Sequence, residues 1–462
     1  MNQKMRSLDK RDFILTGKLS TVILSISAPL MLNNLIQTIY NLTDTMFITL
    51  IDPLAVGAVS FLFPIIYNNM DVAISFSVAA MSLIAQYTGA GRGDKAKLCA
   101  SQLVILSLIL SGGLILINYL FGPGLAVLLG LSGEMYQYGI DYFMVIIWEI
   151  PFIFIMNCYN AVRQGQGDTF TPMVYTVISV ILNIIFDPIF MFVFGMGIRG
   201  AAVATILARL CVCVPELITL SNTESGIRLR FHDIRFHKPM MKQLLSVGLP
   251  AVIGETVSNM GFLVLNYFII GFGDATMTAF AIGNRILNVV TLPIMGIGSG
   301  LAVIIGQNLG AKKIKRAKQA VNISMLIGCG IMVLGGLLMV ATADRTVGFF
   351  AGKEGLIFDQ AKTYLIYLGY SNVFMAAFMV FMGVFQGSGQ SRTMMLMSMI
   401  RLWVIRLPIL WLLGRYTSLN EVSVWISMSF SNAIVDAICW IIYRKGKWEK
   451  GRIEEISAIA NE

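Results

Sequence analysis

The densest cluster of polar side chains lies inside a long apolar stretch near the N-terminus. Four of its residues follow the spacing i, i+3, i+4, i+7 and therefore share one face of a helix: Gln37, Tyr40, Asn41 and Asp44. A carboxyl group among amides and a phenol can hold a proton or a small cation. A polar stripe of this length does not face lipid, so it predicts the wall of a cavity or a seal against another polar helix.

A partner for this stripe is present in another apolar stretch, where Asn183 and Asp187 lie one helical turn apart and Pro188 favours a kink. Because burial disfavours the ionised form of a carboxyl group, Asp44 and Asp187 are suited to taking up and releasing protons. Further hydrogen-bonding groups come from three residues: Asn157, Asn160 and Thr205. The alternative is that both aspartates are permanently paired structural acids.

Ionisable residues also occur in apolar stretches of the second half. Glu255 lies five residues after Pro250, and three arginines could be its counter-charges or could bind anionic groups of substrate or lipid: Arg285, Arg401 and Arg406. A purely structural ion pair is an equal alternative. Four residues are predicted to border a substrate cavity: Gln37, Asn41, Glu255 and Arg285. No role is assigned to four acids that are isolated or close to the ends of apolar stretches: Asp71, Glu149, Glu216 and Asp436.

The elements that carry these residues are predicted to be membrane-spanning helices. Of the 462 residues, 56% are hydrophobic and only 13% are charged, compared with about 25% charged residues in soluble domains. The apolar runs approach or exceed the roughly 18–20 residues that a helix needs to cross the hydrocarbon core, and they lack the alternation of membrane strands. The sequence predicts an all-α protein with twelve spans, at 19–50, 54–85, 98–121, 135–162, 169–194, 198–220, 240–271, 275–307, 319–342, 363–386, 393–414 and 422–443.

The basic residues indicate the orientation of the chain, in which Lys and Arg number 34 and Asp and Glu number 25. Most basic residues outside the spans fall on one side, and the other side has only these: Arg199, Arg345, Lys353, Lys362 and Arg415. By the positive-inside rule, both termini of this multi-pass protein are cytoplasmic. Orientation and contact with anionic lipid explain the net charge of +9, so no nucleic-acid partner is expected. Nor does the polar stretch of the first 18 residues predict a removable signal peptide.

The two halves of the chain repeat one another. Pro29 recurs as Pro250, an offset of 221 residues, and Gln164-Gly165-x-Gly167 recurs as Gln386-Gly387-x-Gly389, an offset of 222. An even number of spans per half predicts parallel repeats, as in many secondary transporters. We expect a six-helix lobe at 1–220, a cytoplasmic linker at 221–239, a second six-helix lobe at 240–444 and a cytoplasmic tail at 445–462. Pro29 is expected to kink the first span.

Motifs for enzymatic chemistry are missing from the sequence. There is no phosphate-binding loop of the form G-x-x-x-x-G-K-[ST], and both histidines, His232 and His237, lie in the linker. The six cysteines, mostly inside apolar runs, suggest neither disulfides nor a metal site. A membrane enzyme or receptor, the alternative outside transport, would need a reactive constellation or a large domain outside the membrane. We therefore expect no enzyme, no metal and no bound cofactor.

The chain resembles the multidrug and toxic compound extrusion (MATE) transporters along nearly its whole length. The resemblance rests on five segments in order: Pro29 with 40–44 (YNLTD), 86–91 (QYTGAG) with Ala96, 164–167 (QGQG), 183–188 (NIIFDP) and 307–311 (QNLGA). The N-terminal segments are most similar to the branch named for a DNA-damage-inducible protein. That likeness assigns cation coupling to Asp44 and Asp187. It matches five residues to their hydrogen-bonding neighbours: Tyr40, Asn157, Asn160, Asn183 and Thr205.

The resemblance implies a monomeric efflux transporter of the cell (inner) membrane, which expels organic, mostly cationic compounds by antiport with H⁺ or Na⁺. Another branch uses a carboxylate in the tenth span together with one in the seventh. Here Glu255 lies in the seventh span, but the tenth, around Tyr370-Ser371-Asn372-Val373, has no acid at that point. The coupling site is therefore expected in the N-terminal half. The alternative function is a flippase for lipid-linked saccharide precursors, which would use the arginines of the second half.

Overall fold

A computed structural model describes residues 3–50, 53–222, 227–229, 234–352 and 354–453 of the chain. Lys353 and parts of the predicted linker (223–226 and 230–233) and tail (454–462) lie outside the described residues. Within the described ranges, twelve helices are long and apolar enough to cross a membrane, and no strand occurs. The predicted all-α architecture with twelve spans is confirmed.

The chain divides into two compact units. The first unit comprises Met1–Phe13 and Leu32–Leu249, and the second comprises Ile14–Met31 and Pro250–Glu462. Helices α2 and α9 therefore each pass from one unit to the other, close to Pro29 and at Pro250 respectively. The predicted boundary between the lobes lies in the linker at 221–239, whereas the two compact units divide within α2 and α9.

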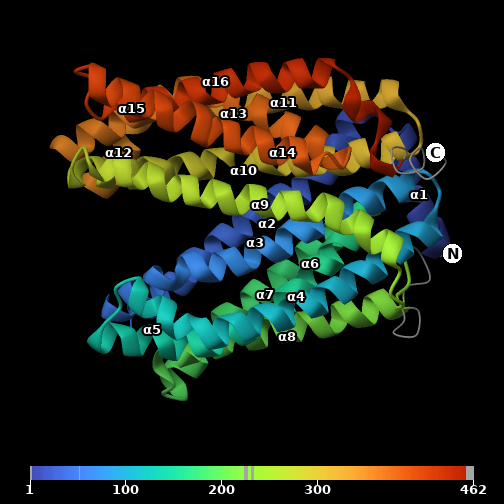
Figure 1. Ribbon diagram of the computed structural model, residues 1–462, viewed down its shortest axis with the longest axis horizontal. Helices are drawn as coiled ribbons and strands as arrows, with labels where there is room; N and C mark the ends of the chain where they lie inside the picture. The colour runs from blue at the N-terminus through green and yellow to red at the C-terminus, as the bar shows by residue number, and fades with distance from the viewer. Residues whose placement is uncertain (1–2, 51–52, 223–226, 230–233, 353, 454–462) are drawn as a thin grey trace. The chain divides into compact units, whose positions relative to one another are not determined.

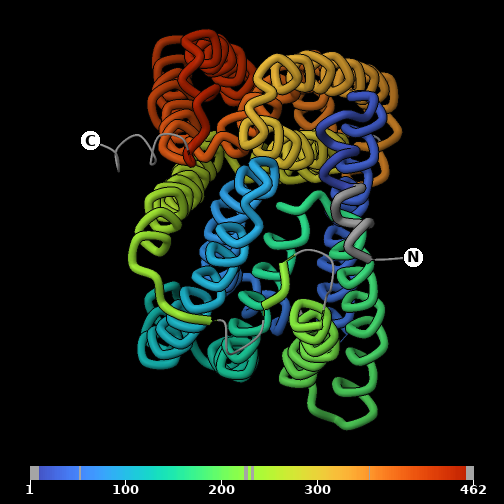
Figure 2. Tube along the Cα trace, turned by 90° about the vertical axis from the view of Figure 1, so that its right-hand side faces the viewer, coloured from blue at the N-terminus to red at the C-terminus, as the bar shows by residue number. Residues whose placement is uncertain are grey.

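The described residues of the first half form eight α-helices (Figure 1). They are α1 (Gln3–Thr16), α2 (Leu19–Thr49), α3 (Pro53–Gly89), α4 (Gly93–Leu128), α5 (Gly133–Ile146), α6 (Ile150–Gly165), α7 (Phe170–Pro188) and α8 (Gly197–Asn222). Helix α3 packs against α4, α5 and α6, and α8 packs against α5, α6 and α7. The hairpin of α7 and α8 is visible as two adjacent green helices in Figure 2.

Prolines interrupt two of these spans next to charged residues. The 3-10 turn η1 (Ile147–Glu149) joins α5 to α6, because Pro151 has no N–H to continue the α-helical hydrogen bonding. At the end of α7, Pro188 is followed by the π-helical turn η2 (Ile189–Val193). Glu149 and Asp187 thus lie at irregular points of their spans, where the backbone changes its winding.

The second half forms α9 (Lys238–Ile270), α10 (Asp274–Gly310), α11 (Ile314–Ala341), α12 (Ala343–Ala351), α13 (Leu356–Gly387), α14 (Ser391–Met399), α15 (Leu407–Tyr416) and α16 (Val422–Arg444). A π-helical segment, η4 (Ile400–Arg406), joins α14 to α15, and the 3-10 turn η5 (Lys447–Lys450) follows α16. Helix α13 packs against α10, α11 and α16. Its Tyr364 meets Trp425 of α16 edge to face, with ring centroids 4.8 Å apart.

The repeated Gln-Gly-x-Gly motif has the same structural role in both halves. A Cβ on Gly165 would lie 3.0 Å from the Cβ of Ile84 on α3, and one on Gly387 would lie 2.9 Å from the Cβ of Ile305 on α10. The second glycine of each motif, Gly167 or Gly389, has a positive φ of 88° or 77°. Small residues let the helices approach closely in membranes, and a positive φ favours glycine. The motif therefore fixes a close helix crossing followed by a left-handed turn.

Candidate functional site

A cavity of about 330 Å³ lies within the first unit, between α2, α3, α6, α7 and α8. Amides and hydroxyls form much of its wall, which includes Asn33, Asn34, Gln37, Tyr40, Asn157, Asn160, Gln164, Thr176, Ser179, Asn183 and Thr205. Arg209 is the single charged residue among those that line it. The cavity has the size and the mixture of apolar and convergent polar groups that are typical of a small-molecule site.

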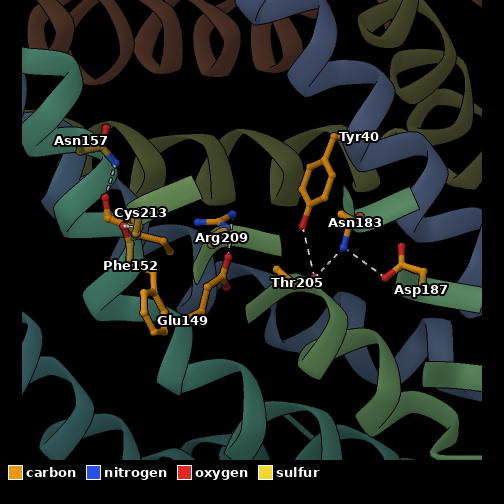
Figure 3. A network of polar contacts seen from close by, with 10 residues as sticks. Tyr40, Glu149, Phe152, Asn157, Asn183, Asp187, Thr205, Arg209 and Cys213 are labelled. Atoms are coloured by element: carbon orange, nitrogen blue, oxygen red, sulfur yellow. Dashed lines mark hydrogen bonds and ion pairs between the residues drawn. The ribbon is translucent and has the colours of Figure 1, made fainter. Parts of the chain in front are cut away.

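Three hydrogen-bonding side chains from three helices meet at one end of this cavity (Figure 3). Asn183 Nδ2 donates to Thr205 Oγ1 at 3.2 Å, and the Tyr40 hydroxyl lies 3.5 Å from the same oxygen. The Asn183 amide also donates to Asp187 Oδ1 at 3.1 Å. We call Tyr40, Asn183 and Thr205 the polar layer. It brings together side chains that the sequence analysis assigned to one site.

The two aspartates predicted to couple cations lie beyond the polar layer. Asp44 follows Tyr40 by one turn on α2, and Asp187 follows Asn183 by one turn on α7. Neither carboxyl lines the cavity, and their residues are only 8% and 0% exposed. Asp44 Oδ1 and Asp187 Oδ2 have no hydrogen-bond partner, and neither residue forms an ion pair with any residue the structure describes. The two acids are therefore buried without a compensating cation.

An ion pair that the sequence analysis did not predict lies beside the polar layer. Arg209 Nη2 of α8 is 2.6 Å from Glu149 Oε1 of η1, and the two side chains are 12% and 5% exposed (Figure 3). The sequence alone assigns no role to Glu149 and does not single out Arg209. The signal was present, because both are charged residues inside predicted spans and Arg209 follows Thr205 by one helical turn.

Other predicted site residues are placed differently. Asn157 and Asn160 line the cavity, but the Asn157 amide donates to its own helix, at Ile153 O, 2.9 Å away. Asn41 is exposed and does not line the cavity, although it follows Gln37 by one turn of α2. Glu255 and Arg285 are exposed residues of the second unit, and neither lines this cavity.

Arg401 and Arg406, which were predicted as possible counter-charges of Glu255, contact uncharged side chains. Arg406 donates to Ser431 Oγ at 3.0 Å and to Asn432 Oδ1 at 3.1 Å, while Arg401 lies over the Phe378 ring at 4.4 Å. Neither guanidinium lies within ion-pair distance of a carboxylate in the described part of the chain. Pro29 lies inside α2, which continues through it as one helix.

The sequence model of the family described as MatE matches the chain twice, over residues 29–189 and 250–412. The chain belongs to the MatE family. The two matches begin at the repeated prolines Pro29 and Pro250, so each half of the chain is one copy of the family's unit. Members of this family are transporters rather than enzymes, and this chain is accordingly a multi-pass membrane transporter.

Curated relatives of this MatE protein match almost end to end. The probable multidrug resistance protein YoeA of Bacillus subtilis is 22% identical over 446 residues, which cover 93% of this chain and 94% of YoeA. The multidrug export protein MepA of Staphylococcus aureus is 24% identical over 416 residues, which cover 89% of this chain and 90% of MepA.

Solved structures share the fold. An outward-facing multidrug resistance MATE family transporter of the MOP superfamily is 25% identical, with a TM-score of 0.89 over 95% of this chain and 98% of its own. A MOP superfamily transporter from Pyrococcus furiosus is also 25% identical, with a TM-score of 0.88 over 94% of this chain and 97% of its own. These matches agree with the twelve-span architecture described above.

Proposed function

We propose that this MatE transporter exports small organic compounds, mostly cations, across the cell membrane by antiport with H⁺ or Na⁺. Asp44 and Asp187 are the coupling carboxyls in this proposal. The observation that carries it is the burial of these two acids next to a polar cavity, where neither forms an ion pair with a described residue. Unpaired carboxyl groups inside a membrane protein are costly and mark ion or proton pathways.

The charges around the cavity support a cationic cargo. Three carboxyl groups, Asp44, Glu149 and Asp187, and one guanidinium, Arg209, lie within one helical turn of the polar layer or beside it. With both aspartates ionised, the cluster carries two net negative charges and attracts a cation. Protonation or Na⁺ binding at Asp44 and Asp187 removes that attraction. The coupling ion and an organic cation therefore compete for the negative charge of the same two carboxylates. The names of the relatives as multidrug export or resistance proteins support export of varied compounds.

The alternating-access cycle then needs two steps that depend on the acids. Uptake of the coupling ion at Asp44 and Asp187 releases the organic cation on the outer side, and α2 changes its bend near Pro29. Return of the site to the inner side releases the ion and admits new cargo. The cycle uses the ion gradient, so no bound cofactor takes part.

Asp44→Asn tests the assignment. The variant keeps the shape of the side chain but cannot titrate, so dye efflux from cells or inverted vesicles should be abolished while the folded protein is retained. Imposing a pH gradient and a Na⁺ gradient separately on wild-type vesicles identifies the coupling ion. Unimpaired efflux by Asp44→Asn, with either gradient, contradicts the proposal.

A second candidate function is a flippase for lipid-linked saccharide precursors. It is favoured by Arg401 and Arg406, two intramembrane guanidinium groups whose hydrogen-bond and ring contacts among the described residues are with uncharged side chains, and which could receive a phosphate. Competition assays separate the two candidates. If the chain is an antiporter of organic cations, other organic cations should slow its transport of a fluorescent dye. If it is a flippase, a lipid-linked diphosphate saccharide should slow that transport instead.

A further inference from the structure

On α2 and α7 the cavity ends at the polar layer. On α2 its lining residues run from Asn33 to Tyr40, and Asp44 is one turn further. On α7 they run from Thr176 to Asn183, and Asp187 is one turn further. One turn of α-helix corresponds to about 5.4 Å along its axis. A cation in the cavity is therefore separated from the coupling carboxyls by a single layer of side chains.

Helix α8 places Arg209 on the cavity side of this layer. The helix runs back beside α7 after a short turn, so residues after Thr205 in the chain lie on the side away from Asp187. Thr205 belongs to the layer, and Arg209, one turn later, lines the cavity. In the view of Figure 3, Arg209 and Asp187 lie on opposite sides of Thr205. Arg209 therefore lies beside the end of the cavity that is nearest to Asp44 and Asp187.

The Glu149–Arg209 pair is oriented with its positive end toward the cavity. Arg209 lines the cavity, whereas Glu149 does not, and the Glu149 side chain is only 5% exposed. Glu149 is held at η1, behind the cavity wall, by the interruption that Pro151 imposes on the fourth span. The pair is neutral as a whole, but its near end repels a cation that approaches through the cavity.

We propose that the Glu149–Arg209 pair is an electrostatic barrier that keeps H⁺ and Na⁺ in the cavity from reaching Asp44 and Asp187. This inference rests on the proposed coupling role of the two aspartates. An antiporter loses its gradient if the coupling ion crosses without cargo, and a fixed positive group beside a narrow path is a known means of excluding protons and cations. A bulky organic cation can still occupy the amide-lined end of the cavity at Asn33 and Asn34, which is about 9 Å along α2 from Tyr40.

The experiment measures proton leak without cargo. The full-length protein is reconstituted in liposomes that contain a pH-sensitive dye, a pH gradient is imposed, and its decay is followed with no organic cation present. Wild-type protein should hold the gradient, and Arg209→Gln should dissipate it several-fold faster. Arg209→Lys keeps the charge and should hold the gradient. Because Arg209→Gln strands the Glu149 carboxylate, Glu149→Gln/Arg209→Gln is measured as well, and it should also leak.

A further substitution tests whether the leaking protons pass through Asp44. Asp44→Asn added to Glu149→Gln/Arg209→Gln should restore the gradient, since the leaking protons are expected to pass through the coupling carboxyl. The barrier is refuted if the pH gradient decays as slowly with Glu149→Gln/Arg209→Gln as with the wild type. It is also refuted if Arg209→Lys and Arg209→Gln leak equally.

The two proposals can fail separately. If Asp44→Asn exports dye normally, the coupling assignment is wrong whatever the leak measurements show. If Asp44→Asn is inactive and the double variant holds its gradient, coupling stands and the barrier alone is wrong.

Discussion

At the scale of single residues, the site is built from pairs that lie one helical turn apart. Three helices each contribute such a pair: Tyr40 and Asp44, Asn183 and Asp187, and Thr205 and Arg209. In each pair one residue belongs to the polar layer, and the other lies beyond it or, for Arg209, on its cavity side. A spacing of four residues therefore separates a hydrogen-bonding function from a charge while keeping both on one helix face.

The Glu149–Arg209 pair allows a prediction about folding stability. Arg209→Gln leaves a buried carboxylate without its partner, and breaking a buried pair in this way costs about 3–5 kcal/mol. The apparent melting temperature in detergent should therefore fall markedly. Glu149→Gln/Arg209→Gln removes both charges and should recover most of the loss. Equal stability of the single and double variants would show that the pair is not energetically coupled.

At the scale of helices, close packing depends on glycines whose neighbours leave no room for a side chain. A Cβ on Gly387 of α13 would overlap the backbone oxygen of Ala302 on α10. Backbone atoms cannot yield as a flexible side chain can, so the two helices would have to separate. The equivalent contact in the first unit is between Gly165 and the backbone oxygen of Met81, 3.1 Å from the added Cβ.

Gly387→Ala should destabilise the protein by about 1–3 kcal/mol, the usual cost of overpacking a filled interface. Gly330→Ala on α11 is the matched control, because a Cβ there meets nothing within 4 Å. Thermal unfolding followed by fluorescence-detected size exclusion measures both variants. The packing argument fails if the two substitutions have the same effect.

Helix α1 is attached to the first unit by groups outside the spans. Lys10 Nζ lies 3.0 Å from Asp168 Oδ1, and Arg11 donates to the carbonyls of Thr88 at 3.0 Å and Gly89 at 2.8 Å. Burial alone would raise the pKa of Asp168, but Lys10 and two hydrogen bonds from Thr171 outweigh it and lower the pKa below the usual 3.8. The ionised form of Asp168 is therefore the one that stabilises this attachment.

The Asp168 contact should depend on pH. Because the pKa is lower in the folded state, its stabilisation is present above about pH 4 and is lost as the pH falls through the folded-state value. Lys10 is nearly half exposed, so Asp168→Asn should cost only about 0.2–1 kcal/mol at neutral pH. Melting temperatures of wild type and variant should converge in acid. A difference that persists there would assign the effect to Thr171 rather than to the ion pair.

At the scale of the whole molecule, two helices connect the compact units. The division falls between Met31 and Leu32 in α2 and between Leu249 and Pro250 in α9. Both helices contain a proline at or near that point, Pro29 in α2 and Pro250 in α9. A proline removes one hydrogen bond of the helix and permits bending at that position. These are the positions at which we expect the chain to bend during transport.

Pro29→Ala and Pro250→Ala should lower the initial rate of dye efflux without lowering thermal stability, because a continuous hydrogen-bond ladder stiffens both helices. Pro64→Ala is the control, since Pro64 lies in the interior of α3, and the whole of that helix belongs to the first unit. Initial rates in vesicles, normalised to the amount of folded protein, measure the effect. If Pro64→Ala lowers the initial rate of efflux as much as Pro29→Ala and Pro250→Ala do, the effect does not depend on where the proline lies.

The sequence by itself determined the twelve spans, the duplication and the residues of the polar layer. These features depend on local properties, because hydrophobicity over about 20 residues predicts a span and a spacing of three or four residues predicts a shared helix face. Tyr40 and Asp44, or Asn183 and Asp187, could therefore be paired from the sequence alone. The same spacing places Asn41 on the face of Gln37, but Asn41 does not line the cavity, because the extent of the cavity depends on the neighbouring helices.

Only the tertiary structure decided which helix faces meet. Glu149 and Arg209 lie 60 residues apart in the chain, and no periodicity within either segment indicates that they form a pair at 2.6 Å. Likewise, the end of the cavity one turn before Asp44 and Asp187 depends on the packing of five helices. Contacts between helices are set by the shapes of whole surfaces, which a local pattern does not contain.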